Sequence, residues 1–297
     1  MKKVLVVVGP TAVGKTKISI ELAKRLGCEI ISGDSVAVYK GLDIGSAKPT
    51  IEEMDGVKHH LIDVRDPKDQ YNVAEFQKAA RAIIDSNEGL SLICGGTGLY
   101  VQSVLFNYEF EAPQRNLEFG NKYHEYSNEE LYQLLVSKDN TINADRIHPN
   151  NRKRVLRALE ILETQNSSIN SFNKKNEPVY DYYICYLSLP RDILYERINK
   201  RVDIMLKDGL EAEVKALYDN NIFPHAIGYQ EFIPYFEGLA SLESVVEEIK
   251  KNSRHLAKRQ ETWFNNQMNS NFYIVNLENI EETIDKIYTD VNEWMCK

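Results

Sequence analysis

The chain has 297 residues, a length that suits one large domain or one domain with an insertion. Its apolar content of 43% and charged content of 27% are those of a globular protein, and its net charge of −8 excludes a surface coated with basic residues. No apolar run approaches the roughly 18 residues that span a membrane, so we expect a cytoplasmic protein. The four dispersed cysteines, with no C-x-x-C pair, predict reduced thiols and no zinc site.

The first predicted element is a buried strand over residues 4–8, and a helix carrying Ile18, Leu22 and Leu26 follows it at a short distance. Between them lies a G-x-x-x-x-G-K-T sequence, which in this context predicts a phosphate-binding loop. Backbone N–H groups and the helix N-terminus would surround an anion, Lys15 would reach its terminal phosphate, and Thr16 would hold Mg²⁺. The loop comprises Gly9, Pro10, Thr11, Ala12, Val13, Gly14, Lys15 and Thr16. A turn that binds nothing is the alternative, but packing alone does not require Gly14, Lys15 and Thr16 in that order.

A second strand is predicted over residues 28–32, and Asp34 follows its end. In a doubly wound sheet, ligands bind at this edge. Three roles remain open for the Asp34 carboxylate: it could cap a turn, ligate Mg²⁺, or act as a general base toward a second substrate.

A third core strand is predicted over residues 90–94, after a helix that begins at Asn72 with Glu75 in a capping box. The segment Gly95-Gly96-Thr97-Gly98 interrupts this strand. Its glycines would let the backbone approach a ligand closely, with the Thr97 hydroxyl as a hydrogen-bond donor. A flexible turn is the alternative.

The composition changes near residues 112 and 113, and residues 113–145 are polar and lack strand patterns. A capping box at Ser127 and Glu130 predicts a helix there. We therefore expect a helical insertion over residues 113–145 in a core formed by residues 1–112 and 146–297. The basic residues of the following stretch 152–157 predict a surface that could hold RNA, although a solubilising surface is an equal alternative.

The last third of the chain contains a predicted strand over residues 180–189 and a helix from Arg191 to near Gly209. Arg197, Lys200 and Arg201 lie on the polar side of this helix, where one of them could reach over the phosphate-binding loop. A long helix over residues 241–268 carries several basic residues and the aromatic pair Trp263 and Phe264, which predicts a second RNA surface.

These pieces together resemble the tRNA dimethylallyltransferase family, also called tRNA isopentenyltransferases or IPP transferases. The resemblance runs from Val4 to about Phe264. It implies an α/β fold in which a P-loop NTPase-like parallel sheet is flanked by helices, with the helical insertion contacting the anticodon stem-loop of tRNA. The matching segments are GPTAVGKT, DS followed by VYKGLDIGSAKP, HHLIDVRDP, GGTGLY, RIHPNNRKRVLRALEI, YERINKRVDIMLKDGLEAEV, AIGYQE and RHLAKRQETWF.

The resemblance implies transfer of a dimethylallyl group from dimethylallyl diphosphate to the exocyclic N6 amine of the adenosine 3′ of the anticodon, with Mg²⁺ as cofactor. The family's general base falls on Asp34, the threonine beside the target adenosine on Thr97, and the diphosphate-facing arginine on Arg201. Ala37, which stands where many members have glutamine, departs from the pattern. The implied tRNA contacts are Asp34, Ser35, Val36, Ala37 and Thr97, then Lys153, Arg154, Val155, Leu156 and Arg157, and finally Arg254, Lys258 and Arg259.

Among the three roles of Asp34, we favour the general base, because the adenine amine must lose a proton as the new bond forms. The alternative function is that of a P-loop small-molecule kinase, which would share the loop but transfer a phosphoryl group from ATP. A small acceptor does not need the basic stretches at 152–157 and 250–259, which favours the transferase. We expect the enzyme to act as a monomer.

Overall fold

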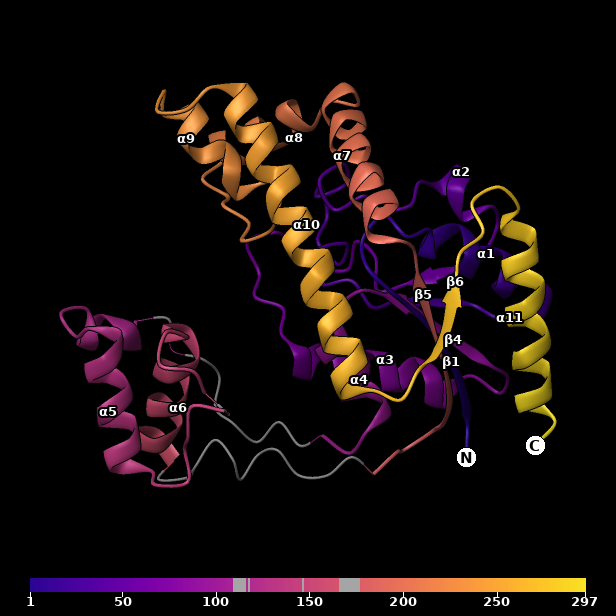
Figure 1. The fold of residues 1–297 in the computed structure, drawn as a ribbon, viewed down its shortest axis with the longest axis horizontal. Coiled ribbons are helices and arrows are strands. Elements are labelled where there is room, and N and C mark those ends of the chain that lie inside the picture. The colour runs from indigo at the N-terminus through magenta and orange to yellow at the C-terminus, as the bar shows by residue number, and fades with distance from the viewer. Residues whose placement is uncertain (109–115, 117, 146, 166–176) are drawn as a thin grey trace. The chain divides into compact units, whose positions relative to one another are not determined.

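The computed structural model describes residues 1–108, 116, 118–145, 147–165 and 177–297. The chain forms two compact units, coloured along the sequence in Figure 1. The sheet unit comprises Met1–Leu105 and Pro178–Lys297, and the insertion unit comprises Phe106–Glu177. The predicted boundary at residues 112 and 113 lies outside the described residues.

The insertion unit is wider than the predicted 113–145, because it also contains α6 (Arg152–Gln165). This helix was predicted to belong to the core of the sheet unit. In the structure, Val155 and Leu159 of α6 are buried against Leu131 and Leu135 of α5 (Asn128–Lys138). The apolar side of α6 therefore completes the core of the insertion unit.

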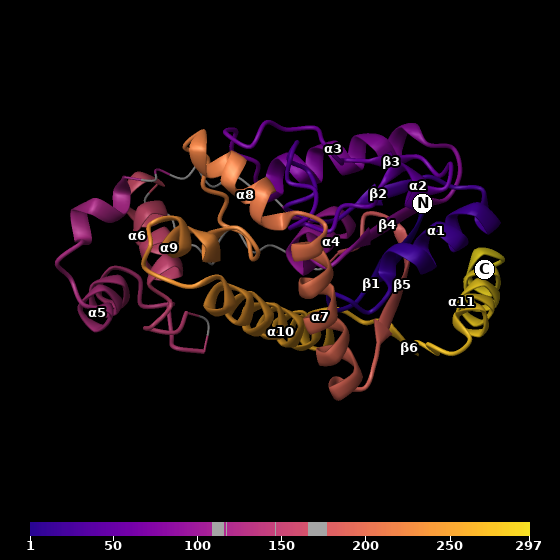
Figure 2. The same cartoon turned by 90° about the horizontal axis from the view of Figure 1, so that it is seen from above.

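The sheet unit is built on six parallel strands in the order β3-β2-β4-β1-β5-β6. Figures 1 and 2 show α1 and α11 on one side of this sheet and α3 and α4 on the other. The central strand β1 is buried on both faces, as its run of valines and leucine predicts. The strands are β1 (Lys3–Val8), β2 (Ile30–Ser32), β3 (His59–His60), β4 (Ser91–Gly95), β5 (Asp181–Ser188) and β6 (Asn271–Ile274).

Two helices of the sheet unit begin at capping residues that the sequence predicted. The Asn72 side chain accepts hydrogen bonds from the N–H groups of Ala74 and Glu75, and Ser241 caps the longest helix. Helix α4 was not predicted, because it is buried on nearly all sides and has no amphipathic pattern. The helices are α1 (Lys15–Leu26), α2 (Ile51–Met54), α3 (Val73–Ser86), α4 (Gly98–Leu105), α7 (Arg191–Lys207), α8 (Leu210–Asp219), α9 (Ile233–Phe236), α10 (Leu242–Gln267) and α11 (Ile280–Met295).

A single carboxylate fastens the loop after β2 to helix α8. Glu213 accepts hydrogen bonds from the consecutive backbone N–H groups of Asp43, Ile44 and Gly45, at 3.0, 2.8 and 3.0 Å. The Tyr229 hydroxyl donates to the same carboxylate at 2.8 Å, and burial together with the Glu213 charge raises the pKa of Tyr229. The loop is thus held by a side chain about 170 residues away in the sequence, which the fold brings into contact with it.

Parallel strands place all their carboxyl ends on one edge of the sheet. The loops that follow β1, β2, β4 and β5 therefore meet at that edge, and they begin at Gly9, Gly33, Gly96 and Leu189. This is the edge at which open α/β sheets bind their ligands.

Candidate active site

The loop between β1 and α1 has the backbone that a phosphate-binding loop requires. Gly14 precedes the first residue of α1 with a φ of 110°, a conformation that strains any residue with a Cβ. Gly9 has a φ of 152°, and a Cβ there would lie 2.5 Å from the carbonyl oxygen of Leu187. Both glycines are therefore needed where the sequence analysis placed the loop.

Lys15 is the first residue of α1 and folds back over the loop. Its Nζ donates hydrogen bonds to the carbonyl oxygens of Gly9 at 3.0 Å and Pro10 at 2.8 Å. The pKa of Lys15 is lowered to about 8, chiefly by burial and also by the nearby Arg201, whereas Cys94 and Asp34 act in the opposite direction. An anion bound at this loop would favour the charged ammonium.

Two arginines of α7 contact the same loop. Arg201 donates from Nη1 to the Thr11 hydroxyl at 3.1 Å, and Arg197 donates from Nε to the Ala12 carbonyl oxygen at 2.9 Å. Burial lowers the pKa of Arg201 and the Asp34 charge opposes this effect, but a guanidinium keeps its charge at neutral pH in either case. The sequence predicted that one arginine of this helix reaches the loop, and in the structure two do.

Asp34 lies in the loop after β2, close enough to Lys15 and Arg201 for its charge to raise the pKa of both. Its Oδ1 accepts hydrogen bonds from the backbone N–H groups of Val36 at 2.7 Å and Ala37 at 3.1 Å. The turn-capping role is therefore present. Oδ2 has no hydrogen-bond partner among the described residues, so the cap orients one oxygen and leaves the other available.

Thr97 lies beside the Asp34 loop, because β2 and β4 are neighbours in the sheet. Its Oγ1 is 3.5 Å from the Ser35 hydroxyl. The N–H of Gly33 donates to the Cys94 carbonyl oxygen at 2.7 Å, and a Cβ on Gly95 would lie 2.5 Å from the Gly33 backbone. The backbones at Gly33 and Gly95 are therefore in direct contact, with no room for a side chain at residue 95.

Gln260, which was not among the predicted site residues, lies on α10 between the phosphate-binding loop and the Thr97 loop. Its Oε1 accepts a hydrogen bond from the Thr11 N–H at 2.9 Å, and its Nε2 donates to the Gly96 carbonyl oxygen at 3.0 Å. One turn further along α10, the Trp263 ring lies where a Cβ on Gly98 would be, at 2.1 Å. The repeated glycines of the Thr97 loop were the only sequence signal for these contacts. They indicate that another group packs closely against the loop, but they do not identify that group as a side chain of α10.

The basic stretches are only partly available to a ligand. In the insertion unit, Lys153 and Arg154 are exposed, whereas Val155 is fully buried and its side chain cannot contact RNA. Arg157 forms an ion pair with Glu160 at 2.7 Å. Arg152, which the sequence assigned to the basic surface, donates to the carbonyl oxygens of Tyr126 and Tyr123 at 2.6 Å.

The surface of α10 shows the same division. Lys258 and Arg259 are exposed, whereas Arg254 is half-buried and donates to the Asn199 side chain at 2.6 Å. Phe264 is fully buried and packs near Tyr186. Phe264 therefore cannot contribute its ring to the predicted RNA surface of this helix, which stays a prediction for the exposed residues.

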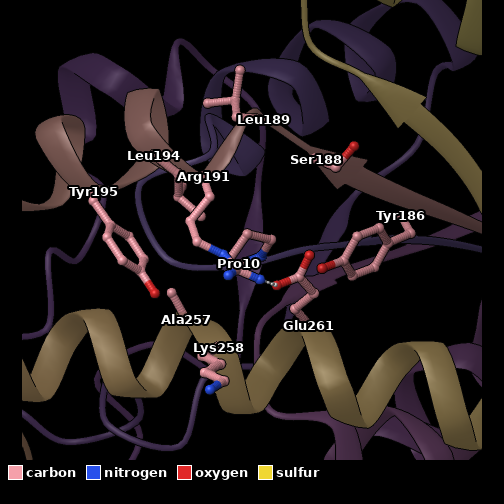
Figure 3. Close-up of a pocket in the computed structure, with 10 residues that line it drawn as sticks. All are labelled: Pro10, Tyr186, Ser188, Leu189, Arg191, Leu194, Tyr195, Ala257, Lys258 and Glu261. Carbon is pink, nitrogen blue, oxygen red and sulfur yellow. Dashed lines mark ion pairs between the residues drawn. The ribbon is translucent and has the colours of Figure 1, made fainter.

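A cavity of about 230 Å³ lies behind the phosphate-binding loop, between the end of β5, α7 and α10. Pro10 is one of its lining residues, and Figure 3 shows the Tyr186 hydroxyl directed into it. Arg191 and Glu261 approach each other across it, at 4.0 Å. Lys15, Asp34, Thr97 and Arg201 do not line this cavity, so the cluster at the sheet edge is separate from it.

The geometry at the sheet edge agrees with comparisons to known proteins. A family model described as IPP transferase matches residues 37–267. The tRNA dimethylallyltransferase of Macrococcus caseolyticus is 46% identical over 298 residues, covering 97% of this chain and 95% of that protein. The tRNA dimethylallyltransferase of Bacillus subtilis is 48% identical, covering 89% and 88%.

Solved structures show the same likeness over nearly the whole chain. The tRNA isopentenylpyrophosphate transferase of Bacillus halodurans superposes with a TM-score of 0.75 at 40% identity, covering 99% of this chain and 97% of that one. A eukaryotic dimethylallyltransferase, crystallised while acting on tRNA, gives a TM-score of 0.82 at 28% identity, covering 97% and 78%. The predicted P-loop NTPase-like fold is thereby confirmed. With the family model matching most of its length and relatives this similar, the chain belongs to the IPP transferase family.

Proposed function

We propose that the protein transfers a dimethylallyl group from dimethylallyl diphosphate to the N6 amine of the adenosine 3′ of the anticodon in tRNA, releasing diphosphate. One observation carries this proposal: a phosphate-binding loop lies beside a carboxylate with an unpartnered oxygen at the same sheet edge. The names of the relatives, and the tRNA-bound dimethylallyltransferase among the similar structures, support it.

The chemistry that this arrangement supports is a displacement at the first carbon of the allylic group. The bond from that carbon to the diphosphate oxygen breaks as the bond to the adenine nitrogen forms, and the amine proton passes to Oδ2 of Asp34. An adenine amine is a weak nucleophile, so charge on the leaving diphosphate must be stabilised. The loop N–H groups, Lys15 and Arg201 supply that stabilisation, and removal of the proton contributes roughly 10²–10⁴-fold in rate.

The residues present fit a Mg²⁺ ion that is held largely by substrate. Among the described residues, no group of three or more His, Cys, Asp or Glu side chains could hold a metal ion by itself. Thr16 is exposed at the second position of α1, where its hydroxyl could join diphosphate oxygens and water in the octahedral shell that Mg²⁺ prefers. Bound there, Mg²⁺ would neutralise charge on the leaving diphosphate.

Thr16→Val should raise the Mg²⁺ concentration needed for half-maximal transfer, because valine keeps the shape of threonine and removes the hydroxyl ligand. We expect a shift of about tenfold, the size of one lost ligand contact of 1–2 kcal/mol. Thr16→Ser is the control, since it keeps the hydroxyl and should leave the requirement unchanged. Equal Mg²⁺ requirements for all three proteins would remove Thr16 from the metal site.

The proposed tRNA contacts are the exposed cations Lys153 and Arg154 of the insertion unit and Lys258 and Arg259 of α10. Phosphate contacts of this kind release counterions from the nucleic acid.

No helix in the described part of the chain has both the length and the apolar composition that a membrane crossing needs. We further propose that the enzyme works as a monomer on the anticodon stem-loop.

Arg154→Ala combined with Lys258→Ala should flatten the slope of log affinity for tRNA against log salt concentration. Each lost phosphate contact should change the slope by roughly 0.7 to 0.9. The matched control replaces two exposed lysines elsewhere, Lys58 and Lys286, by alanine. If both double variants bind tRNA with the wild-type slope in filter-binding assays, Arg154 and Lys258 only solvate the surface.

The proposed function is tested by incubating the protein with unmodified tRNA and dimethylallyl diphosphate labelled in its allylic group. Label in the RNA, lost when the target adenosine is replaced by guanosine, is the expected result. Phosphate transferred from ATP to a small acceptor, without label in RNA, would instead identify a kinase.

A further inference from the structure

Gln260 lies half-buried on α10 and contacts two loops that are far apart in the sequence. Its carboxamide uses both of its polar atoms: Oε1 accepts from the Thr11 N–H at 2.9 Å, and Nε2 donates to the Gly96 carbonyl oxygen at 3.0 Å. The first loop is the phosphate-binding loop, and the second carries Thr97. One side chain therefore connects the loop for the diphosphate donor to the loop predicted to contact the acceptor adenosine.

The fit of this side chain explains why residue 96 is glycine. A Cβ on Gly96 would lie 2.2 Å from Nε2 of Gln260, and the next nearest atoms are Cδ of Gln260 at 3.3 Å and the Gly9 carbonyl oxygen at 3.7 Å. Gly96 is not among the residues with positive φ, so its backbone would accept alanine. Among the described residues, the only close obstacle to a side chain at residue 96 is therefore the Gln260 carboxamide.

The connection continues beyond the two loops. Thr11, whose N–H is bound by Gln260, accepts a hydrogen bond on its hydroxyl from Arg201 at 3.1 Å. On the other side of Thr97, the Trp263 ring fills the space beside Gly98. Helix α10 thus contacts the Thr97 loop on both sides of Thr97.

We infer that Gln260 is a positioning residue that fixes the separation of the diphosphate loop and the adenosine loop, so that the two reacting groups meet in line. This inference rests on the proposed function. Each loop keeps its own substrate contacts without Gln260, because Gln260 occupies neither Lys15 nor Oδ2 of Asp34. The loss should therefore appear in the alignment of bound substrates, where a displacement near 1 Å costs of order 10²-fold in rate.

Gln260→Ala should lower the single-turnover rate at saturating substrates by about 10–10²-fold. The dissociation constants for dimethylallyl diphosphate and for tRNA, measured separately, should stay within about threefold of wild type. This is the size of effect expected when a substitution does not touch the binding contacts themselves. Gln260→Glu should not rescue the rate, because its second oxygen would face the Gly96 carbonyl. Gln267→Ala, an exposed glutamine on the same helix, is the matched control and should behave as wild type.

A double-mutant cycle with Gly96→Ala tests the contact itself. Gly96→Ala alone should displace the Gln260 side chain and reduce both the transfer rate and the melting temperature. In the Gln260→Ala background, the same Gly96→Ala change should have little effect, because the obstacle is gone. Additive effects of the two changes, or an unchanged rate in Gln260→Ala, would overturn the inference.

The cycle also separates this inference from the proposed function. If the wild-type protein transfers no dimethylallyl group at all, the proposed function fails and the melting temperatures still report whether Gln260 and Gly96 are coupled. If the wild type is active and Gln260→Ala loses affinity for both substrates with no change in the rate at saturation, Gln260 is merely structural and the positioning role is refuted.

Discussion

Asp34→Asn should slow single-turnover transfer by roughly 10²-fold or more, because it removes the group that we propose accepts the amine proton. Asparagine keeps the oxygen that accepts hydrogen bonds from the Val36 and Ala37 N–H groups, so the turn should be preserved. It replaces Oδ2 by an amide that cannot take up a proton. The affinity for dimethylallyl diphosphate and the Mg²⁺ dependence should change little. Rapid-quench assays with labelled donor and excess enzyme measure this step directly.

The metal-ligand role of Asp34 gives the opposite pattern. If Asp34 held Mg²⁺, raising the Mg²⁺ concentration should restore most of the activity of Asp34→Asn. That result would contradict the general-base role and assign Asp34 to the metal. Asp69→Asn, an exposed aspartate in a loop on the same unit, serves as the control for the loss of one negative charge.

Lys15→Ala is the second change for which we expect a large effect. The Lys15 ammonium already lies against the phosphate-binding loop, where it donates to the Gly9 and Pro10 carbonyl oxygens. A charge-assisted hydrogen bond from it to phosphate would contribute about 1.5–3 kcal/mol. Diphosphate affinity, measured by calorimetry, should therefore fall by roughly 10–10²-fold. Binding of tRNA should remain near normal, since the exposed cations lie elsewhere. An equal loss of affinity for tRNA would contradict this assignment.

The pH dependence of diphosphate binding gives an independent test of Lys15. Its pKa of about 8 in the free protein means that the ammonium loses its proton as the pH rises through 8. Because diphosphate favours the charged form, affinity should fall above pH 8, approaching tenfold for each pH unit. Lys15→Arg keeps its charge and should flatten this dependence. For stability the sign is reversed: the unfolded chain binds more protons between pH 8 and 10.5, so this group's contribution to stability rises with pH in that range.

The parts of the site that the sequence predicted are those set by neighbouring residues. The phosphate-binding loop depends on Gly9 and Gly14, and its strand and helix are adjacent in the chain. Capping boxes at Asn72 and Ser127 likewise predicted helix starts correctly, because the capping contacts span only three residues. Local chemistry of this kind is readable without knowing the fold.

The parts that could not be predicted depend on which distant segments meet. Gln260 contacts Thr11 across 249 residues, and nothing in its own neighbourhood separates it from the exposed glutamine Gln267. The apolar side of α6 could equally have packed on the sheet, and only the position of α5 decides that Val155 completes the insertion unit. Asp34 is intermediate: its turn cap was foreseeable, but its closeness to Arg201 required the three-dimensional arrangement.

The hydrogen bonds from the loop after β2 to the Glu213 carboxylate also affect where an anion can bind. Three successive backbone N–H groups at Asp43, Ile44 and Gly45 point inward around its carboxylate, a concave arrangement that generally attracts phosphate. Here the protein's own side chain occupies that hollow and already satisfies its donors. These three N–H groups are therefore not available to a polyphosphate. They do not compete with the N–H groups of the phosphate-binding loop, Gly9 to Thr16. Because Glu213 already neutralises the N–H groups at Asp43, Ile44 and Gly45, we expect a diphosphate donor to bind at Gly9 to Thr16 instead.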